Sequence, residues 1–281
     1  MARRAPSVER AVAVLNHLAQ DPQRRWSLSD LARDLDLSKA TAHAVLTSLV
    51  QTGYLVRDED KSYSLGPALI AVGDAAQAAF PGARVAQRQM DELAARFDLE
   101  VVASTAIGDE IVILARSGNP RPLGIDVRPG QRLPLVPPLG TVFVAWAAAD
   151  RIDRWLSELG PDATAADRDA AREALGIVRD RRYAVALGGE RQQRIVEQVT
   201  SRRQGGGGDD YGLSELAETQ SYRISQIGAP VFGPDGAVVL GLFLIGFRGE
   251  IAAAEVPAYA QALLEAADEV TAALRGRVPV G

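Results

Sequence analysis

The sequence contains no cysteine and only two histidines. The absence of cysteine excludes disulfides, thiolate zinc sites and cysteine nucleophiles. Both histidines, His17 and His43, fall near the start, so the rest of the chain has neither a Ser-His-Asp triad nor a histidine-ligated metal. Carboxylate pairs such as Asp109 with Glu110 fall in a predicted turn, where water solvates them. We therefore expect no enzyme, no cofactor and no metal site.

Long apolar runs and a basic excess are also missing. No stretch of about 20 apolar residues is present to span a bilayer, and the start does not have the pattern of a signal peptide. We therefore expect a cytoplasmic protein without a membrane partner. The 31 basic and 36 acidic residues give a net charge of −5, which excludes a wholly basic nucleic-acid protein. Any DNA affinity must come from local basic groups and from dimerisation. The length of 281 residues indicates about two domains.

The segment Ser38–Val50 has the pattern of a recognition helix. Ser38 is a good N-cap, and apolar residues from Ala42 to Leu49 recur three and four positions apart. The opposite face is small and polar and carries no acid, so it fits a major groove without repelling phosphate. From this segment we expect DNA contacts by Ser38, Lys39, Thr41, His43, Thr47 and Ser48.

A second helix is predicted just upstream, at Leu28–Leu35 with Ser29 as its N-cap. Asp36 follows where the turn between the helices needs a left-handed residue. This spacing is typical of a helix-turn-helix. A further helix, expected to be capped by Ser7, would cover the pair with a face that includes Val8 and Val12.

A hairpin is predicted downstream, because aromatic and β-branched residues at 53–57 and 61–65 flank an acidic turn. A helix-turn-helix followed by a hairpin is a winged helix, with Arg57 and Lys61 expected on DNA phosphates. The residues also allow an alternative interpretation, in which this segment is a small helical domain that contacts other proteins and not DNA.

The pattern of the remaining chain predicts a linker helix at 66–80 and then a domain of short strands and helices.

In this second domain, Gly108-Asp109 indicates a hairpin, and Arg128–Gly140 is predicted to be a proline-rich loop. Short antiparallel strands with helices predict an α+β fold. Gly205–Asp210 is expected to be a loop; it lacks the Lys-Ser/Thr of a phosphate cradle. The expected strands are 100–106, 110–116, 123–127, 222–232 and 237–246, and the expected helices are 85–97, 141–149, 151–159, 162–181 and 255–274.

Taken together, these motifs resemble the IclR family of transcriptional regulators. The resemblance rests on Ser7–Ala11, Leu28–Ala32, Ser38–His43, Gly53–Leu55, Tyr63–Gly66, Gly130–Leu135, Arg182–Val185 and Ile227–Phe232. It implies a winged helix-turn-helix reader at 1–66, a linker helix at 67–82, and a GAF-like domain for effector binding and oligomerisation at 83–281. It also implies a homodimer, or a homotetramer built as a dimer of dimers, on a palindromic operator in double-stranded DNA, where the protein acts as a repressor or as an activator.

The sequence departs from the family pattern at positions that concern operator preference and effector binding. The family often has arginine where this chain has Ala44, so the operator preference does not carry over. Gln226 stands at a position that is commonly cysteine, and Phe243 and Ile245 stand where serines are common. The candidate effector-binding residues that the resemblance implies are Thr105, Arg116, Leu135, Pro138, Leu139, Gly140, Gln226, Phe243 and Ile245.

Two interpretations of these apolar replacements remain open. The site binds a larger, more apolar effector, oriented by a few polar groups such as Gln226, Thr105 or Arg116. Alternatively, Phe243 and Ile245 fill the space as core, and the domain only oligomerises. We favour the apolar effector over a small acid, because an unpaired carboxylate is costly to bury.

Overall fold

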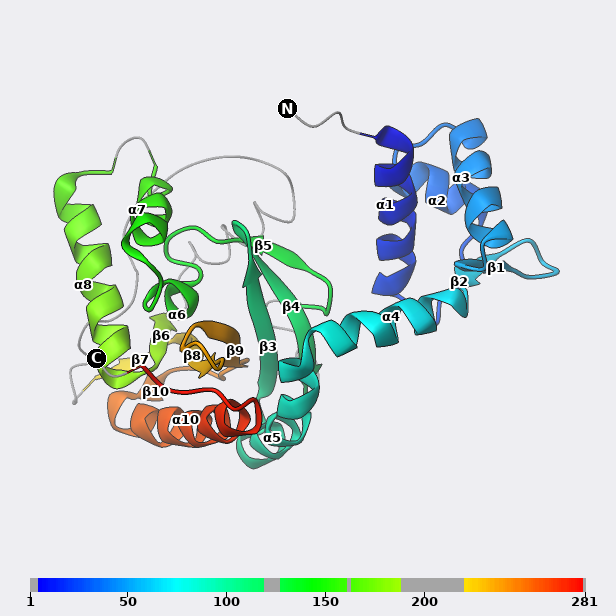
Figure 1. The fold of residues 1–281 in the computed structure, drawn as a ribbon. Helices are drawn as coiled ribbons and strands as arrows, with labels where there is room; N and C mark the ends of the chain where they lie inside the picture. The colour runs from blue at the N-terminus through cyan, green and yellow to red at the C-terminus, as the bar shows by residue number, and fades with distance from the viewer. Residues whose placement is uncertain (1–4, 119–126, 161–162, 188–219, 280–281) are drawn as a thin grey trace. The chain divides into compact units, whose positions relative to one another are not determined.

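The computed structural model describes residues 5–118, 127–160, 163–187 and 220–279. The chain separates into two compact units, Met1–Phe80 and Pro81–Gly281. Figure 1 shows the helices and strands of both units.

The first unit is a three-helix bundle with a hairpin and a following helix. The predicted helix-turn-helix and hairpin are both present, and β1 and β2 pair antiparallel from Leu55↔Leu65 to Arg57↔Tyr63. The elements are α1 (Pro6–Gln20), α2 (Leu28–Asp34), α3 (Lys39–Gln51), β1 (Leu55–Arg57), β2 (Tyr63–Leu65) and α4 (Ala68–Ala79).

The core of this unit joins all three helices to the hairpin. Its buried residues are Val14, Leu18, Trp26, Leu31, Leu46, Leu49, Leu55 and Tyr63. Trp26 also extends the hairpin, because its N–H donates to Tyr63 O at 3.3 Å and the Tyr63 N–H donates to Trp26 O at 2.8 Å. The wing is therefore anchored to the segment before α2 by backbone hydrogen bonds as well as by apolar packing.

The start and the buried face of helix α1 differ from the sequence prediction. Helix α1 begins at Pro6 with Ala5 at its N-cap, so Ser7 lies inside the first turn and does not cap the helix. The predicted apolar face is also shifted, since Val8 and Val12 are 60% and 48% exposed. The buried stripe of α1 instead runs through Val14 and Leu18, which are four residues apart and therefore share one face of the helix.

The second unit is built on an antiparallel sheet with the strand order β5-β4-β3-β9-β8-β6. A separate two-stranded pair joins β7 to β10. The elements are α5 (Pro81–Phe97), β3 (Glu100–Ile107), β4 (Glu110–Ser117), β5 (Arg132–Pro134), α6 (Thr141–Val144), α7 (Ala149–Ser157), α8 (Ala165–Arg181), β6 (Ala184–Leu187), β7 (Ser221–Tyr222), β8 (Ile224–Phe232), β9 (Val238–Ile245), β10 (Ile251–Ala252), a 3-10 helix (Ala253–Glu255) and α10 (Val256–Ala273).

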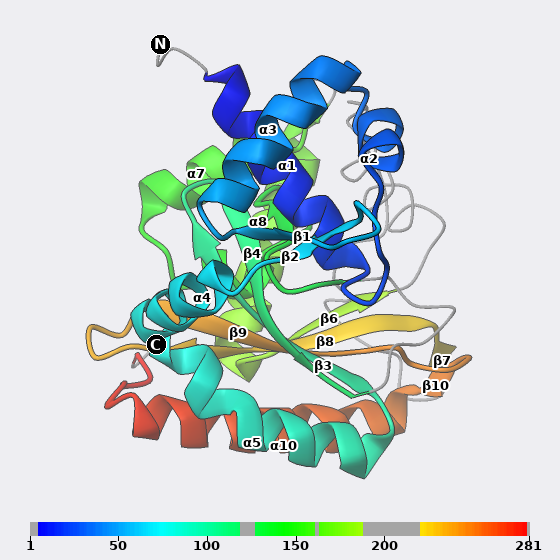
Figure 2. The ribbon, with the colours of Figure 1, turned by 90° about the vertical axis from the view of Figure 1, so that its right-hand side faces the viewer.

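Helices cover both faces of this sheet. Helices α5 and α10 run side by side along one face (Figure 2), over a core that includes Met90, Leu242 and Leu263. Helices α6, α7 and α8 lie on the other face (Figure 1), over a core that includes Phe143 and Trp155. The expected fold class, α+β with an N-terminal winged helix-turn-helix, is confirmed.

Several predicted elements change in this unit. The edge strand β5 forms inside the segment predicted as a loop, and Pro134 is tolerated there because an edge strand needs fewer backbone donors. The helix predicted at 141–149 is shorter, since α6 ends at Val144, and the helix predicted at 151–159 starts two residues earlier, at Ala149. Strand β6 was not predicted. The predicted strand 123–127 falls outside the described residues except for Val127, which is in no strand, and Gly205–Asp210 also lies outside them.

Candidate DNA interface and effector site

The turn and cap before α3 place the recognition helix. Asp36 has a φ of 50°, the left-handed conformation predicted for it, and the Leu37 N–H donates to Ala32 O at 2.8 Å. Ser38 caps the helix as predicted: its Oγ accepts from the Thr41 N–H at 3.1 Å. Local hydrogen bonds therefore fix the residue at which the helix starts.

One side of α3 is buried and the other is open to solvent. Ala42, Leu46 and Leu49 are buried, and no acidic residue occurs in the helix. At 100° per residue, the centre of the open face is held by Ala40, Ala44, Thr47 and Gln51, with His43 and Ser48 on its flanks. All six are exposed. Gln51 is absent from the sequence prediction, although its spacing of four from Thr47 marks it.

Three of the predicted hydroxyl contacts also have partners inside the protein. Ser38 Oγ and Thr41 Oγ1 lie 2.8 Å apart, and Ser48 Oγ donates to Ala44 O at 3.1 Å. These groups keep lone pairs that can accept a hydrogen bond. Lys39 is the first residue of α3 and is exposed, as are His43 and Thr47.

The wing presents its two predicted cations near its turn. Arg57 is exposed at the end of β1, with its guanidinium 5.9 Å from the centre of the Tyr63 ring. Lys61 is exposed in the turn with a φ of 65°, and its N–H donates to Asp58 O. Asp58 also forms an ion pair with Arg25. This pairing neutralises part of the acidic turn, which the sequence pattern did not reveal.

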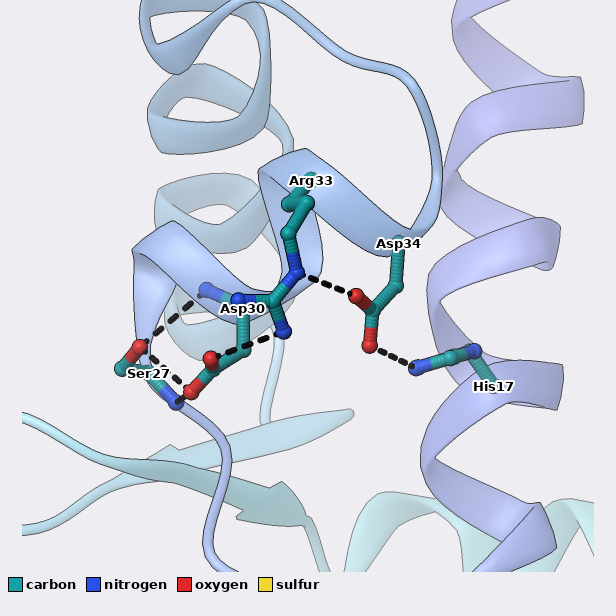
Figure 3. A network of polar contacts seen from close by, with 5 residues as sticks. All are labelled: His17, Ser27, Asp30, Arg33 and Asp34. Atoms are coloured by element: carbon teal, nitrogen blue, oxygen red, sulfur yellow. Dashed lines mark hydrogen bonds and ion pairs between the residues drawn. The ribbon is translucent and has the colours of Figure 1, made fainter.

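A polar network holds α2 in place (Figure 3). Ser27 and Asp30 form a reciprocal capping box, with Ser27 Oγ donating to Asp30 Oδ2 at 2.7 Å. Arg33 links the two acids of α2, at 3.1 Å to Asp30 and 2.9 Å to Asp34. His17 Nε2 lies 3.5 Å from Asp34 Oδ2 and so ties α1 to α2. The N-cap is therefore Ser27 and the predicted cap Ser29 is wrong, because only Ser27 stands three residues before the N–H and the carboxylate of Asp30.

Replacing Ser27 with alanine is expected to destabilise the first unit by about 1 kcal/mol, because it removes the cap of α2. The hydroxyl and the backbone N–H of Ser27 lower the pKa of Asp30 below its ordinary value of 3.8. The part of the stabilisation that comes from the Asp30 carboxylate is therefore present at neutral pH and is lost as the pH falls through the pKa of Asp30 in the folded state. Urea unfolding at pH 7 and pH 3 measures both effects.

Ser29→Ala is the matched control for this prediction and is expected to change the free energy of unfolding by less than about 0.5 kcal/mol. Equal losses in the two variants, or a loss at Ser27 that does not shrink at pH 3, would contradict the assignment of the cap.

Four of the candidate effector residues share one face of the large sheet. Val102 on β3 pairs directly with Arg116 and with Phe243, and Gln226 pairs with Ile245. Directly opposed residues on antiparallel strands point to the same side. Val102 belongs to the core cluster under α6, α7 and α8, so this face is the one that those helices cover.

The loop before α6 brings further candidates to this face. Leu135 and Leu139 are buried in the same cluster, and Phe243 and Ile245 pack against it. The Trp155 Nε1–H donates to Leu139 O at 2.9 Å and holds the loop. Pro138 and Gly140 lie half-buried in this loop.

Thr105 is not brought together with these residues. It follows Val102 on β3 by three positions, so strand alternation turns its side chain toward the face covered by α5 and α10. Its hydroxyl donates to Val239 O at 2.9 Å. The sequence could not separate the two faces because the pairing register is not visible in it.

A buried ion pair lies on the candidate effector face. Arg116 Nη1 is 3.6 Å from Glu100 Oε2 and donates to Val127 O at 3.2 Å. The Glu100 side chain is only 3% exposed, and Glu100 lies opposite Ile245 in the sheet. A carboxylate therefore accompanies the arginine that was predicted to orient the effector.

The Phe243 ring covers two glycines on the same face. A Cβ added to Gly228 would approach the ring at 2.5 Å, and one added to Gly241 would approach it at 2.6 Å. The ring also lies 6.2 Å from the ring of Phe143. Both glycines therefore make room for Phe243, which occupies part of the space over strands β8 and β9.

Two other kinds of site receive no support from the residues that the structure describes. Among them, no helix combines the length and apolarity needed to cross a membrane. The described segments also hold no group of three or more His, Cys, Asp or Glu side chains arranged to bind a metal ion.

Comparison with known proteins agrees with this geometry. The profile of the IclR helix-turn-helix domain matches residues 7–59. The chain is 22% identical over 271 residues to the HTH-type transcriptional regulator KipR of Bacillus subtilis, which covers 96% of this chain and 98% of KipR. It is 45% identical over 74 residues to the glycerol operon regulatory protein of Streptomyces coelicolor, which covers 26% of this chain and 29% of that protein.

Solved structures show the same fold. The Thermotoga maritima IclR has a TM-score of 0.66 at 19% identity, with 96% of this chain and 99% of that chain covered. An IclR homolog from Microbacterium hydrocarbonoxydans, complexed with 4-hydroxybenzoate, has a TM-score of 0.65 at 21% identity, with the same coverage.

The fold and the exposed recognition helix define a DNA-binding transcriptional regulator with a winged helix-turn-helix. Residues 7–59 match the IclR helix-turn-helix domain, and the fold is similar over 96% of the chain to that of the Thermotoga maritima IclR. The curated relatives of the chain are regulators rather than enzymes, in agreement with the expectation from the sequence.

Proposed function

We propose that the chain is a cytoplasmic transcriptional regulator that binds a palindromic operator as a homodimer or as a dimer of dimers. The reader comprises residues 1–66, the linker helix 67–82, and the effector-binding and oligomerisation domain 83–281. The observation that carries the proposal is the exposed, acid-free face of α3 beside a wing with two cations. The DNA contacts are made by Ser38, Lys39, Thr41, His43, Thr47, Ser48, Arg57 and Lys61.

These residues divide into phosphate contacts and base contacts. Lys39 lies about 100° from Ala40 around the helix, away from the centre of the open face, which suits a phosphate. Arg57 and Lys61 on the wing have the same role. His43 and Thr47 lie on the open face, where bases are read.

Lys39→Ala is expected to weaken binding to all DNA sequences alike and to lower the salt slope by about one, because one phosphate contact is lost. Equilibrium binding between low and high salt measures the slope, and Arg154→Ala on the exposed surface of α7 is the control. A changed order of preferred sequences would instead make Lys39 a base reader.

Selection from a random double-stranded library with the full chain tests the DNA proposal. Enriched sequences are expected to contain two inverted half-sites about one helical turn, or a multiple of it, apart, since the operator mirrors the two-fold axis of a dimer. A library that enriches no common sequence would contradict specific binding.

The effector domain is proposed to bind a small, mainly apolar molecule on the sheet face under α6–α8, which shifts the population of DNA-binding arrangements. Leu135, Leu139, Phe243 and Ile245 supply apolar contacts there. The homolog complexed with 4-hydroxybenzoate, an aromatic carboxylate, supports a small effector that contains an aromatic ring. The candidate residues are Arg116, Leu135, Pro138, Leu139, Gly140, Gln226, Phe243 and Ile245; Thr105 faces the other side.

Short polar acids are expected not to bind, because the buried Glu100 carboxylate already accompanies Arg116 on this face. Calorimetry with two- to four-carbon carboxylic acids measures this, with uncharged aromatic compounds as the comparison. Micromolar binding of a short acid would contradict the apolar site.

A second candidate function follows from the Phe243 ring, which already fills space above Gly228 and Gly241. In this alternative the domain only oligomerises. Thermal shifts of the parent and of Phe243→Ala with uncharged aromatic compounds separate the two. Stabilisation of the parent supports an effector site, whereas stabilisation of Phe243→Ala alone supports a filled core.

A further inference from the structure

We propose that α3 reads its operator mainly through the C5 methyl groups of thymine, which contact the methyl groups of Ala40, Ala44 and Thr47. The inference rests on the proposed DNA-binding function and names the bases that this site prefers. Ala40 and Ala44 have no role in the DNA contacts described above.

The three residues form one apolar line along the open face. Counted at 100° per residue, Ala40, Ala44 and Thr47 fall within an arc of about 60°, directly opposite the buried Leu46 and Leu49. All three are exposed. From Ala40 to Thr47 the helix rises about 10.5 Å, which matches about three base-pair steps of 3.4 Å.

Few side chains along this face of α3 can form hydrogen bonds with base edges. Guanine is usually read by arginine or lysine and adenine by asparagine or glutamine, each with two hydrogen bonds. The helix contains no arginine and no asparagine, and Lys39 lies off the open face. Gln51 is its only glutamine and stands at the far end. Recognition helices contact bases chiefly with their N-terminal residues, which here present methyl groups.

The polar side chains beside this apolar line already have hydrogen-bond partners within the protein or stand to one side. The methyl groups of the line are therefore the main groups available for direct base readout. Ser48 Oγ donates to the Ala44 carbonyl at 3.1 Å, and Ser38 and Thr41 hydrogen-bond each other at the cap. His43 stands at one side and can add a single hydrogen bond. Thymine is the base that offers an apolar group in the major groove, so methyl-to-methyl contact discriminates it.

Replacing thymine by deoxyuridine in the selected operator tests the proposal, because it removes the methyl group and keeps the base pairing. Each half-site thymine is replaced singly and then all together, and the Kd of the full chain is measured at fixed salt. One buried methyl is expected to change Kd about fourfold, and three together about 60-fold. Thymines outside the half-sites are the control and are expected to have no effect.

Variants of α3 test which alanine methyl group contacts which thymine methyl group. In Ala44→Ser the alanine methyl becomes a hydroxymethyl, so the loss on replacing one particular thymine is expected to fall from about fourfold to less than twofold. Ala40→Ser is expected to do the same for a different thymine. Ala19→Ser on the exposed surface of α1 is the matched control and is expected to leave every loss unchanged.

Three results would overturn the proposal: a fully uracil-substituted operator that binds within twofold, losses that are identical in the parent and both α3 variants, or half-sites that contain no thymine. Each is distinct from failure of the DNA-binding function itself, in which the unmodified operator would bind no better than a shuffled duplex.

Discussion

Ala44→Glu is expected to weaken binding to the operator by about 100-fold or more without unfolding the protein. Ala44 lies at the centre of the open face of α3, where no acid occurs in the parent. A carboxylate placed there meets the phosphates and the acceptor edges of the groove, and such like-charge contacts cost several kcal/mol. Glutamate favours helix almost as well as alanine, so the helix itself is retained.

Ala19→Glu on α1 is the matched control, because it adds the same charge to another exposed helical alanine in the same unit. Equilibrium binding gives the Kd, and circular dichroism with thermal unfolding verifies the fold. If Ala44→Glu kept the affinity of the parent, α3 would not enter the groove and the protein-contact interpretation of this unit would be preferred.

Gly66→Ala is expected to destabilise the first unit by about 3 kcal/mol. A Cβ at this position would lie 2.2 Å from Gly53 O and 2.8 Å from the carbonyl carbon of Tyr54. Both neighbours are backbone atoms, and the Gly66 N–H donates to Tyr54 O at 2.8 Å. The backbone must therefore move and strain this hydrogen bond, at the upper end of overpacking costs.

Gly73→Ala in α4 is the control, because nothing lies within 4 Å of the position that its Cβ would take. An alanine inside a helix is favoured over glycine, so this variant is expected to be stabilised by about 0.5–1 kcal/mol. Urea unfolding of both variants measures the difference. A Gly66→Ala protein as stable as the parent would show that the chain between the wing and α4 can be repacked.

The sequence predicted the recognition helix well because its signals are local. Ser38 caps α3 and Asp36 takes the left-handed conformation, and both depend only on residues within one turn. The hairpin and the apolar side of α3 were predicted for the same reason. The error at Ser29 arose because Ser27 and Ser29 both precede apolar helical residues, and the structure selects the one that can bond to Asp30.

Features that depend on tertiary packing could not be predicted as well from the sequence. Val8 and Val12 have helical spacing with the partly buried Ala11 and Leu15 but are themselves exposed, because spacing alone does not fix the exact rotation of the buried stripe around the helix. Trp26 joins the hairpin through a pairing that spans 37 residues of sequence. No local pattern encodes such a contact.

The candidate effector site depends on strand register, which the sequence leaves undetermined. Arg116 and Phe243 share a face because both pair with Val102 across three strands. Thr105 lies on the opposite face, because it follows Val102 on β3 by an odd number of positions. The partnership of Arg116 with Glu100 also joins two strands, and it alters the chemistry expected of this face.

Competition binding of the full chain to its selected operator and to a shuffled duplex, at one physiological salt concentration, is the direct test of whether the winged helix reads DNA sequence. We expect the operator to bind about 1,000-fold more tightly or better, as sequence-specific regulators do. A ratio of the two affinities near one would show that the winged helix does not read DNA sequence.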